Sequence, residues 1–153
     1  MSLTRIACFL VLLLPIVAAV SCGQKLPPRP AGMPNPVPCT IIVQDESGSP
    51  IDKALVVLRP DDGGQWAASG ATDSAGRAAV KTDGLYVGAV PGKYKVTVAK
   101  TEMIPTGQMS EEGTETVQVN VLIDPIFSKP TTTPFSLEVG AEGATETFKV
   151  KKP

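Results

Sequence analysis

Carboxylates and cysteines are the side chains that offer this chain most of its chemistry, because the sequence contains no histidine. Without histidine, a Ser-His-Asp or Cys-His catalytic unit and a histidine metal site are both excluded. Asp45, Glu46 and Asp73 flank predicted strands that would bring them to one end of an antiparallel fold. Ca²⁺ prefers oxygen ligands, so these three residues are the candidate ligands of a weak calcium site.

Turn formation is the competing explanation for these acids. Aspartate side chains accept hydrogen bonds from backbone amides about two residues further along, so turns collect aspartates without any metal. A second group of acids, Asp61, Asp62 and Asp83, is expected at the opposite end of the fold for the same reason. Neither group resembles an EF-hand loop. We therefore favour turn capping and predict that the chain holds neither a metal nor a cofactor.

Three further features have both a structural and a functional interpretation. No histidine can activate the Cys39 thiol, so we interpret Cys39 as a small buried apolar residue. Trp66, the sole tryptophan, either packs in the core or stacks on a sugar ring, and we favour core packing. Lys149, Lys151 and Lys152 either contact acidic lipid or phosphate or form a solvated tail, which is the ordinary case.

The composition indicates one globular domain built from short strands. The 153 residues are 42% hydrophobic and 19% charged, which is typical of folded proteins. The 15 prolines and 14 glycines indicate many turns and favour strands over long helices. A formal net charge of −1 provides no basic face, so we expect no nucleic-acid partner.

Residues 1–21 have the properties of a secretory signal peptide. Arg5 is their only charged residue, and it precedes an apolar run over residues 6–20. This run is shorter than the roughly 20 residues that a membrane-spanning helix needs. We therefore predict that residues 1–21 are removed.

The segment Ala19-Val20-Ser21-Cys22 resembles the lipobox of bacterial lipoproteins. The resemblance implies transfer of diacylglyceryl to the Cys22 thiol, cleavage before Cys22 and acylation of the new amino terminus. Ala19 departs from the leucine commonest in the motif, and an ordinary signal peptide with a chance cysteine is the alternative. Gly23 is not the aspartate of an inner-membrane retention signal, which favours the outer membrane and a domain facing the periplasm or the exterior.

Residues 22–38 are predicted to form a lipidated, proline-rich linker. They hold six of the 15 prolines, and such a sequence favours an extended conformation that acts as a semi-rigid spacer. A PPRP ligand for an SH3 domain is the alternative, and we favour the tether. Cys8 lies in the signal peptide and Cys22 is expected to carry lipid, so Cys39 has no partner for a disulfide within the chain.

Alternating apolar residues predict the strands of residues 39–153. The clearest strand spans 93–100, where Tyr94, Val96 and Val98 share one face. We predict a polar loop over 101–114 and a closing hairpin about residues 140–143. The other predicted strands span 40–45, 53–59, 65–72 paired with 77–82, 116–123, 135–139 and 145–150. This pattern predicts an all-β fold, a single seven- to eight-stranded antiparallel Greek-key β-sandwich.

Two motifs in this region resemble carboxypeptidase regulatory-like domains, which have a transthyretin-like (prealbumin-like) fold. The first motif is G-x-T-D-x-x-G-x-φ, where φ is apolar, and here it comprises Gly70, Thr72, Asp73, Gly76 and Ala78. The second is P-G-x-Y-x-V-x-V, and here it comprises Pro91, Gly92, Tyr94, Val96 and Val98. The chain is also similar to small lipoproteins of planctomycete-type bacteria. The resemblance implies the sandwich fold over about residues 39–150, and it implies no catalytic residue.

Enzymes that share this fold depend on residues that the chain lacks. Hydroxyisourate hydrolases use histidines and a characteristic C-terminal tetrapeptide, and intradiol dioxygenases hold iron with tyrosine and histidine. This sequence has no histidine, has only Tyr86 and Tyr94, and ends in KVKKP. We therefore predict that the protein is not an enzyme.

The expected function is that of a non-enzymatic, lipid-anchored protein of the bacterial cell envelope. Its β-sandwich would serve as a structural or protein-interaction module. The alternative is a module that binds a small ligand or a glycan at one end of the sandwich or on a sheet face. The expected partners are membrane lipid through acylated Cys22 and an envelope protein or glycan, and the domain itself is expected to be a monomer.

Replacing Cys22 by alanine tests the anchor. Because the thiol is the only group on this residue that accepts the diacylglyceryl unit, Cys22→Ala should accumulate as unlipidated precursor. Metabolic labelling with an alkyne fatty acid measures the change. Undiminished label on the variant would refute the assignment.

Overall fold

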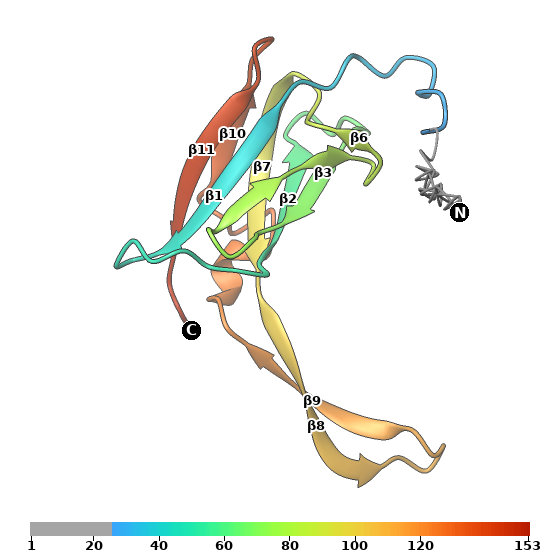
Figure 1. Ribbon diagram of the computed structural model, residues 1–153, viewed down its shortest axis with the longest axis vertical. Helices are drawn as coiled ribbons and strands as arrows, with labels where there is room; N and C mark the ends of the chain where they lie inside the picture. Colours follow the sequence, from blue (N-terminus) through green and yellow to red (C-terminus); the bar gives the residue numbers. More distant parts are fainter. Residues whose placement is uncertain (1–25) are drawn as a thin grey trace, which may run out of the picture.

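The computed structural model describes residues 26–153, so the predicted signal peptide (1–21) and the predicted lipidation site Cys22 lie outside the described residues. Two β-sheets pack face to face in the described part (Figure 1). One sheet has the order β11-β1-β4, with β1 (Cys39–Asp45), β4 (Arg77–Ala79) and β11 (Ala144–Val150). The other has the order β10-β7-β2-β3-β5-β6, with β2 (Leu55–Pro60), β3 (Ala68–Ala71), β5 (Lys81–Thr82), β6 (Tyr86–Val87), β7 (Gly92–Ala99) and β10 (Ser136–Val139). The predicted all-β sandwich is confirmed.

Alternation along the strands places the core between the two sheets. Ile41 and Val43 of β1 and Val96 and Val98 of β7 are completely buried, as their period of two residues predicts. Cys39 belongs to the same core, where burial raises the pKa of its thiol to about 11. A thiol with this pKa is uncharged at neutral pH, which agrees with its interpretation as a buried apolar residue.

Strand pairing differs from the prediction at two turns. The strands on either side of residues 140–143 do not pair with each other, because β10 pairs antiparallel with β7 whereas β11 pairs with β1. The β1–β11 ladder is parallel, from Cys39 opposite Ala144 to Asp45 opposite Val150. The predicted pairing of 65–72 with 77–82 is confirmed only where β3 pairs with β5, because β4 belongs to the other sheet. Both turns therefore carry the chain from one layer of the sandwich to the other.

A two-stranded hairpin, β8 (Thr101–Met109) and β9 (Glu115–Val121), projects from one end of the sandwich (Figure 1). The predicted polar loop over 101–114 is therefore wrong, and the predicted strand over 116–123 exists but does not join the sandwich. Pro105 is tolerated because a free strand edge requires no backbone N–H. Gly107, at a φ of +71°, lies where the ladder shifts register between Pro105 and Met109. Such a shift is a β-bulge, for which glycine supplies the positive φ.

The hairpin returns to the sandwich through a 3-10 helix, η1 (Pro125–Phe127). Asp124 caps this helix, since its Oδ1 accepts a hydrogen bond from Ile126 N at 3.0 Å. Phe127 stacks on Phe135 with ring centroids 5.0 Å apart, and Phe135 contacts Phe148 of β11 at 4.6 Å. These three rings close the end of the sandwich from which the hairpin emerges.

The second half of the predicted linker is docked on the domain and is not a free spacer. Val37 pairs with Ala89, with N–H···O distances of 2.8 and 3.0 Å. Gly88, at a φ of +102°, permits this approach, because a Cβ there would lie 2.1 Å from the Val37 carbonyl oxygen. A side chain at position 88 would therefore displace the linker.

Nearer its N-terminal end, the linker contacts a small apolar cluster. Met33 is buried against Tyr86 and Val90. Trp66 packs on the same cluster but is only partly buried and precedes β3, so, contrary to the prediction, it belongs neither to a strand nor to the main core. The Tyr86 hydroxyl donates to the Pro28 carbonyl oxygen at 3.1 Å. The proline-rich composition did not reveal this docking, which leaves a shorter spacer than predicted.

Candidate interaction surface

The candidate calcium ligands are engaged in turns. Asp73 Oδ1 accepts hydrogen bonds from the backbone amides of Ala75 and Arg77, each at 2.9 Å. These contacts hold the turn between β3 and β4, which is the role that turn capping predicts.

Asp45 does the same in the turn that follows β1. Its Oδ1 accepts from Ser47 Oγ at 2.6 Å and from Ser49 N at 2.9 Å, and these bonds lower the pKa of the Asp45 carboxyl. Glu46 is exposed beside it. Across residues 26–153, no three acidic or cysteine side chains are placed to hold a metal, so Asp45, Glu46 and Asp73 do not form a ligand set. The second acidic group behaves similarly, since Asp62 Oδ1 accepts from Gly64 N at 2.9 Å.

The β8–β9 hairpin has one apolar face. Residues directly opposite in an antiparallel ladder share a face, and Met103 opposes Val119 while Pro105 opposes Val117. Val121, opposite Thr101, continues the same face to the base of the hairpin. We call this set (Met103, Pro105, Val117, Val119 and Val121) the apolar face. Toward the tip the same side of the ribbon continues to Glu115, opposite Met109.

The opposite face of the ribbon is mostly polar. It carries Glu102 opposite Asn120, Ile104 opposite Gln118, and a hydrogen-bonded pair of threonine hydroxyls, Thr106 and Thr116. Ile104 is the exception on this face. The hairpin is therefore an amphipathic ribbon.

The apolar face is exposed to solvent. Met103 is 70% exposed, Val119 54%, Val117 50% and Val121 41%. A two-stranded ribbon cannot cover its own side chains, and an isolated hairpin is at best marginally stable in water. A large exposed apolar patch on a folded protein typically marks an interaction site.

The root of the hairpin is fixed to the sandwich. Lys100 Nζ lies 2.7 Å from Asp52 Oδ1, and this hydrogen-bonded ion pair lowers the pKa of the Asp52 carboxyl. The Leu122 amide donates to the Lys100 carbonyl oxygen at 2.9 Å. Lys151 adds a longer ion pair with Asp124 at 3.4 Å. These contacts give the hairpin a defined direction relative to the sandwich.

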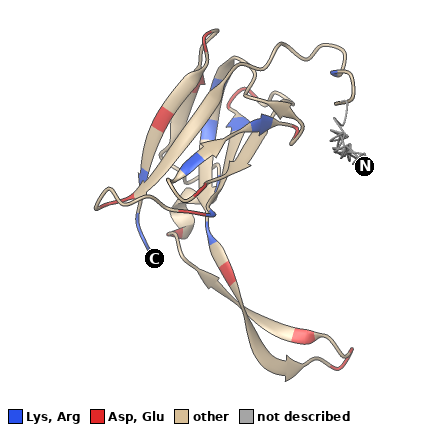
Figure 2. Cartoon of the chain, in the orientation of Figure 1, with Lys and Arg blue, Asp and Glu red and all other residues tan. Residues whose placement is uncertain are grey.

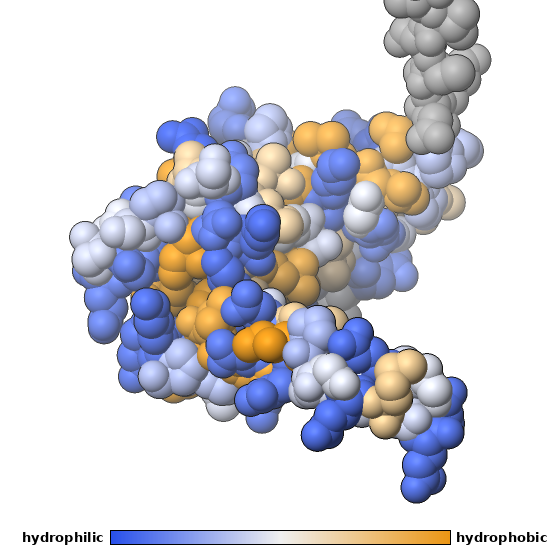
Figure 3. All heavy atoms as spheres, turned by 60° about the horizontal axis from the view of Figure 1, so that its bottom comes forward, coloured by the Kyte–Doolittle hydropathy of each residue, from blue (hydrophilic) through white to orange (hydrophobic). Residues whose placement is uncertain are grey.

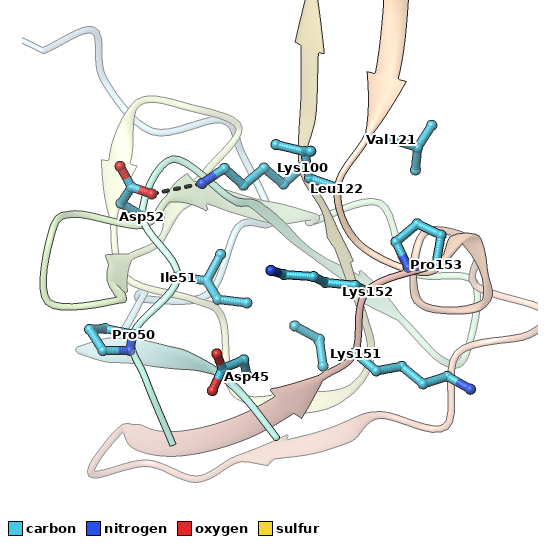
Figure 4. A pocket seen from close by; sticks show the side chains of 11 residues that line it. Asp45, Pro50, Ile51, Asp52, Lys100, Val121, Leu122, Lys151, Lys152 and Pro153 are labelled. Atoms are coloured by element: carbon cyan, nitrogen blue, oxygen red, sulfur yellow. Dashed lines mark hydrogen bonds and ion pairs between the residues drawn. The ribbon is translucent and has the colours of Figure 1, made fainter. Parts of the chain in front are cut away.

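A cavity of about 500 Å³ lies at this root and continues the apolar face (Figure 4). It is lined by side chains of the sandwich, the hairpin root and the C-terminal segment: Asp45, Pro50, Ile51, Asp52, Lys100, Val121, Leu122, Val150, Lys151, Lys152 and Pro153. Lys152 extends into the cavity, whereas Lys151 points away from it (Figure 4). Hydrophobic residues gather on the surface near the hairpin base (Figure 3).

Charge is distributed unevenly along the hairpin (Figure 2). Residues 101–121 contain four glutamates (102, 111, 112 and 115) and no lysine or arginine. Glu111 and Glu112 form the tip, while Lys100, Lys151 and Lys152 surround the root. The tip is therefore acidic, whereas the root carries acids and lysines together: Asp45 and Asp52 line the same cavity, and Lys100 and Lys151 are paired with Asp52 and Asp124.

Sequence reasoning missed this surface in part. The alternation of Val117, Val119 and Val121 predicted a strand, but it could not show whether a second layer covers the valines. Pro105 and Gly107 made the preceding segment resemble a loop. A single apolar residue, Met103, was not enough to predict a strand with an apolar face.

Comparison with known proteins identifies no family for the chain. No protein-family model matches the sequence, and no curated protein matches it. The crystal structure of BcpA, the major pilin subunit of Bacillus cereus, aligns at 18% identity and a TM-score of 0.43, covering 78% of this chain and 31% of the pilin chain. A 9R-lipoxygenase from Cyanothece PCC8801 aligns at 14% identity and a TM-score of 0.38, covering 85% of this chain and 18% of the enzyme chain. This chain thus spans less than a third of the length of either protein, and the likenesses carry no functional argument. No helix within residues 26–153 is long and apolar enough to cross a membrane.

The Asp73 contacts predict how an alanine substitution behaves. Asp73→Ala removes two hydrogen bonds from turn amides, so it should reduce the free energy of unfolding by about 0.5–2 kcal/mol, as for comparable caps. The loss should be the same in chelator and in millimolar calcium, because no ligand set surrounds the residue. Thermal melts of both proteins measure it. A calcium-dependent stabilisation confined to the wild type would restore the metal interpretation.

Proposed function

We propose that this chain is a non-enzymatic, lipid-anchored protein of the bacterial cell envelope that binds a protein partner through the β8–β9 hairpin. The observation that carries the proposal is the exposed apolar face, whose valines and Met103 contact no second layer within the described residues. Burial of apolar area is the main favourable term in protein association. The hairpin is therefore the surface that gains most from a partner.

The direction of the hairpin favours a partner that lies on the side of the domain away from the proposed lipid anchor. The described chain enters the sandwich at the end opposite to the hairpin (Figure 1). A lipid on Cys22, followed by the linker, would thus attach at the far end from the hairpin. The four glutamates of the hairpin disfavour insertion into a membrane, because charged groups are costly in hydrocarbon. These features favour a protein partner over the bilayer.

The sequence motifs support membership of the carboxypeptidase regulatory-like family through their structural roles. Gly76 has a φ of +73°, and a Cβ there would lie 2.5 Å from the Val43 carbonyl oxygen. Thr72 Oγ1 accepts from Ala54 N at 2.8 Å, and the Tyr94 hydroxyl donates to the Val90 carbonyl oxygen at 2.6 Å. These motif residues thus stabilise the fold, which fits a binding module better than an enzyme.

One observation favours the alternative, a small-ligand or glycan-binding module. The root cavity combines an apolar lining from Ile51 and Val150 with the ammonium group of Lys152. A glycan site usually offers an aromatic platform, and no aromatic side chain lines the root cavity. The cavity also continues the apolar face, so we treat both as one surface for a protein.

Affinity capture of the partner from membranes, with the tagged full-length chain as bait, tests the proposed function. Val117→Thr together with Val119→Thr removes apolar area and keeps β-branched side chains, so the hairpin should still form. Tagged full-length protein should retain its partner after mild crosslinking, and the double variant should lose it. The matched control, Gln118→Thr with Asn120→Thr, alters the polar face of the same strand and should capture as well as the wild type.

Two results would contradict the proposal. Equal capture by the apolar-face variant and the wild type would show that the hairpin is not the binding surface. Equal loss in both variants would show that any change to β9 unfolds the hairpin, without a role for its apolar side chains.

A further inference from the structure

We propose that the β6 end of the sandwich rests on the membrane surface, and that the docked linker holds it there. This inference rests on the proposed function, because it takes the lipid on Cys22 as the anchor. The side chains that would contact the bilayer are Leu26, at the start of the described linker, and Leu85 and Val87, which precede and follow Tyr86 of β6. We call these three exposed side chains the anchor-side surface.

The length of free chain limits how far this end of the domain can lie from the bilayer. Leu26 follows Cys22 by four residues, and an extended chain spans at most about 3.5 Å per residue, which is about 14 Å in total. A linker that was free as far as Val37 would instead span about 45 Å as a polyproline-like chain at about 3.1 Å per residue. Docking of the linker therefore decides whether the domain must lie at the bilayer surface.

Hydrogen bonds from Tyr86 tie the start of the linker to β6. Its hydroxyl lies 3.3 Å from the Pro27 carbonyl oxygen and 3.1 Å from that of Pro28. Pro27 directly follows Leu26, so these bonds place Leu26 at the same end of the domain as β6 (Figure 1). The apolar cluster around Met33 holds the rest of this segment. The anchor would thus attach beside β6.

Apolar side chains are exposed at this end of the domain. Val87 is 68% exposed, Leu26 59% and Leu85 45%. Tyr86 is buried, so its two neighbours lie on the outer side of β6, which is an edge strand of its sheet. Hydrophobic residues are visible on the surface near the start of the described chain (Figure 3). Such side chains gain free energy from burial at the boundary between lipid headgroups and acyl chains.

Charge does not select this surface, because both signs are present near it. Arg29 and Lys81 are exposed, but so is Asp83 in the turn before β6, and Asp62 lines a small pocket with Trp66. The short tether and the apolar side chains therefore carry the inference. Contact with the bilayer should not require anionic lipid and should not weaken in high salt.

The same placement directs the β8–β9 hairpin away from the bilayer. The described chain begins at the end of the sandwich opposite to the hairpin (Figure 1). The apolar face of the hairpin would thus stay free for a protein partner while the anchor-side surface meets lipid. The two exposed apolar surfaces of the domain would therefore have different partners.

Fluorescence quenching of the full, lipidated chain in phosphatidylcholine vesicles tests the contact. Val87→Cys carries a thiol-reactive dye, and lipids with a nitroxide on the headgroup serve as the quencher. The native Cys39 should not react, since its thiol is buried with a raised pKa. The dye at position 87 should be quenched equally in low and high salt. Val119→Cys, also an exposed valine but on the hairpin, is the control and should stay unquenched.

A change in the linker tests whether docking sets the contact. In the Val87→Cys background, Met33→Asp places a charge in the buried cluster, so it should release the linker and abolish the quenching. Pro34→Asp adds the same charge at the next, exposed position and should leave the quenching unchanged. Both variants should still melt cooperatively, because Met33 lies outside the main core.

The outcomes separate this inference from the proposed function. Equal quenching at positions 87 and 119 in a chain that carries lipid on Cys22 overturns the membrane contact and leaves the anchor and the hairpin partner standing. Unchanged quenching in Met33→Asp overturns the role of the docked linker, and loss of quenching in high salt overturns its apolar basis. Absence of lipid on Cys22, measured by the alkyne label, would refute the anchor and this inference together.

Discussion

A strand can bury its side chains only where a second layer covers it, and this constraint divides the molecule at Lys100. Strand β7 lies in the sandwich, and its Val96 and Val98 are completely buried. The chain continues in the same extended conformation into β8, where every residue is exposed. The same backbone geometry therefore gives a core strand on one side of Lys100 and an unpartnered ribbon on the other.

The contacts around that division hold the ribbon in a defined position. The Lys100–Asp52 pair, the cap that Asp124 gives to η1 and the stacked ring of Phe127 all lie where the hairpin leaves the sandwich. Surface ion pairs contribute little to stability on their own, so their effect here is mainly on direction. A hairpin with a fixed root presents its apolar face before any partner arrives. Binding then costs less conformational entropy than folding a loop onto the partner would.

The sequence predicted those features that depend on local alternation and on turn chemistry. The core strands predicted over 40–45 and 93–100, the capping by Asp73 and the burial of Cys39 follow from residue type and spacing. Features that depend on which strands pair, and on which sheet covers them, could not be predicted from alternation and turn residues. The valines of β9 have the same alternation as a core strand, and the turn at residues 140–143 has the composition of a hairpin although its strands lie in different sheets. Met33 is buried because the linker lies against Tyr86, whose hydroxyl donates to the Pro28 carbonyl oxygen.

Hydrogen exchange of the full chain tests the central claim that the hairpin lies outside the sandwich core and that a single chain leaves its apolar face uncovered. In dilute protein, the amides of residues 101–121 should exchange orders of magnitude faster than those of β1, β2 and β7, because local opening of the ribbon exposes no core. Slow exchange of the hairpin in dilute protein, equal to that of β7, would contradict the account, because it would show that a single chain already covers the apolar face.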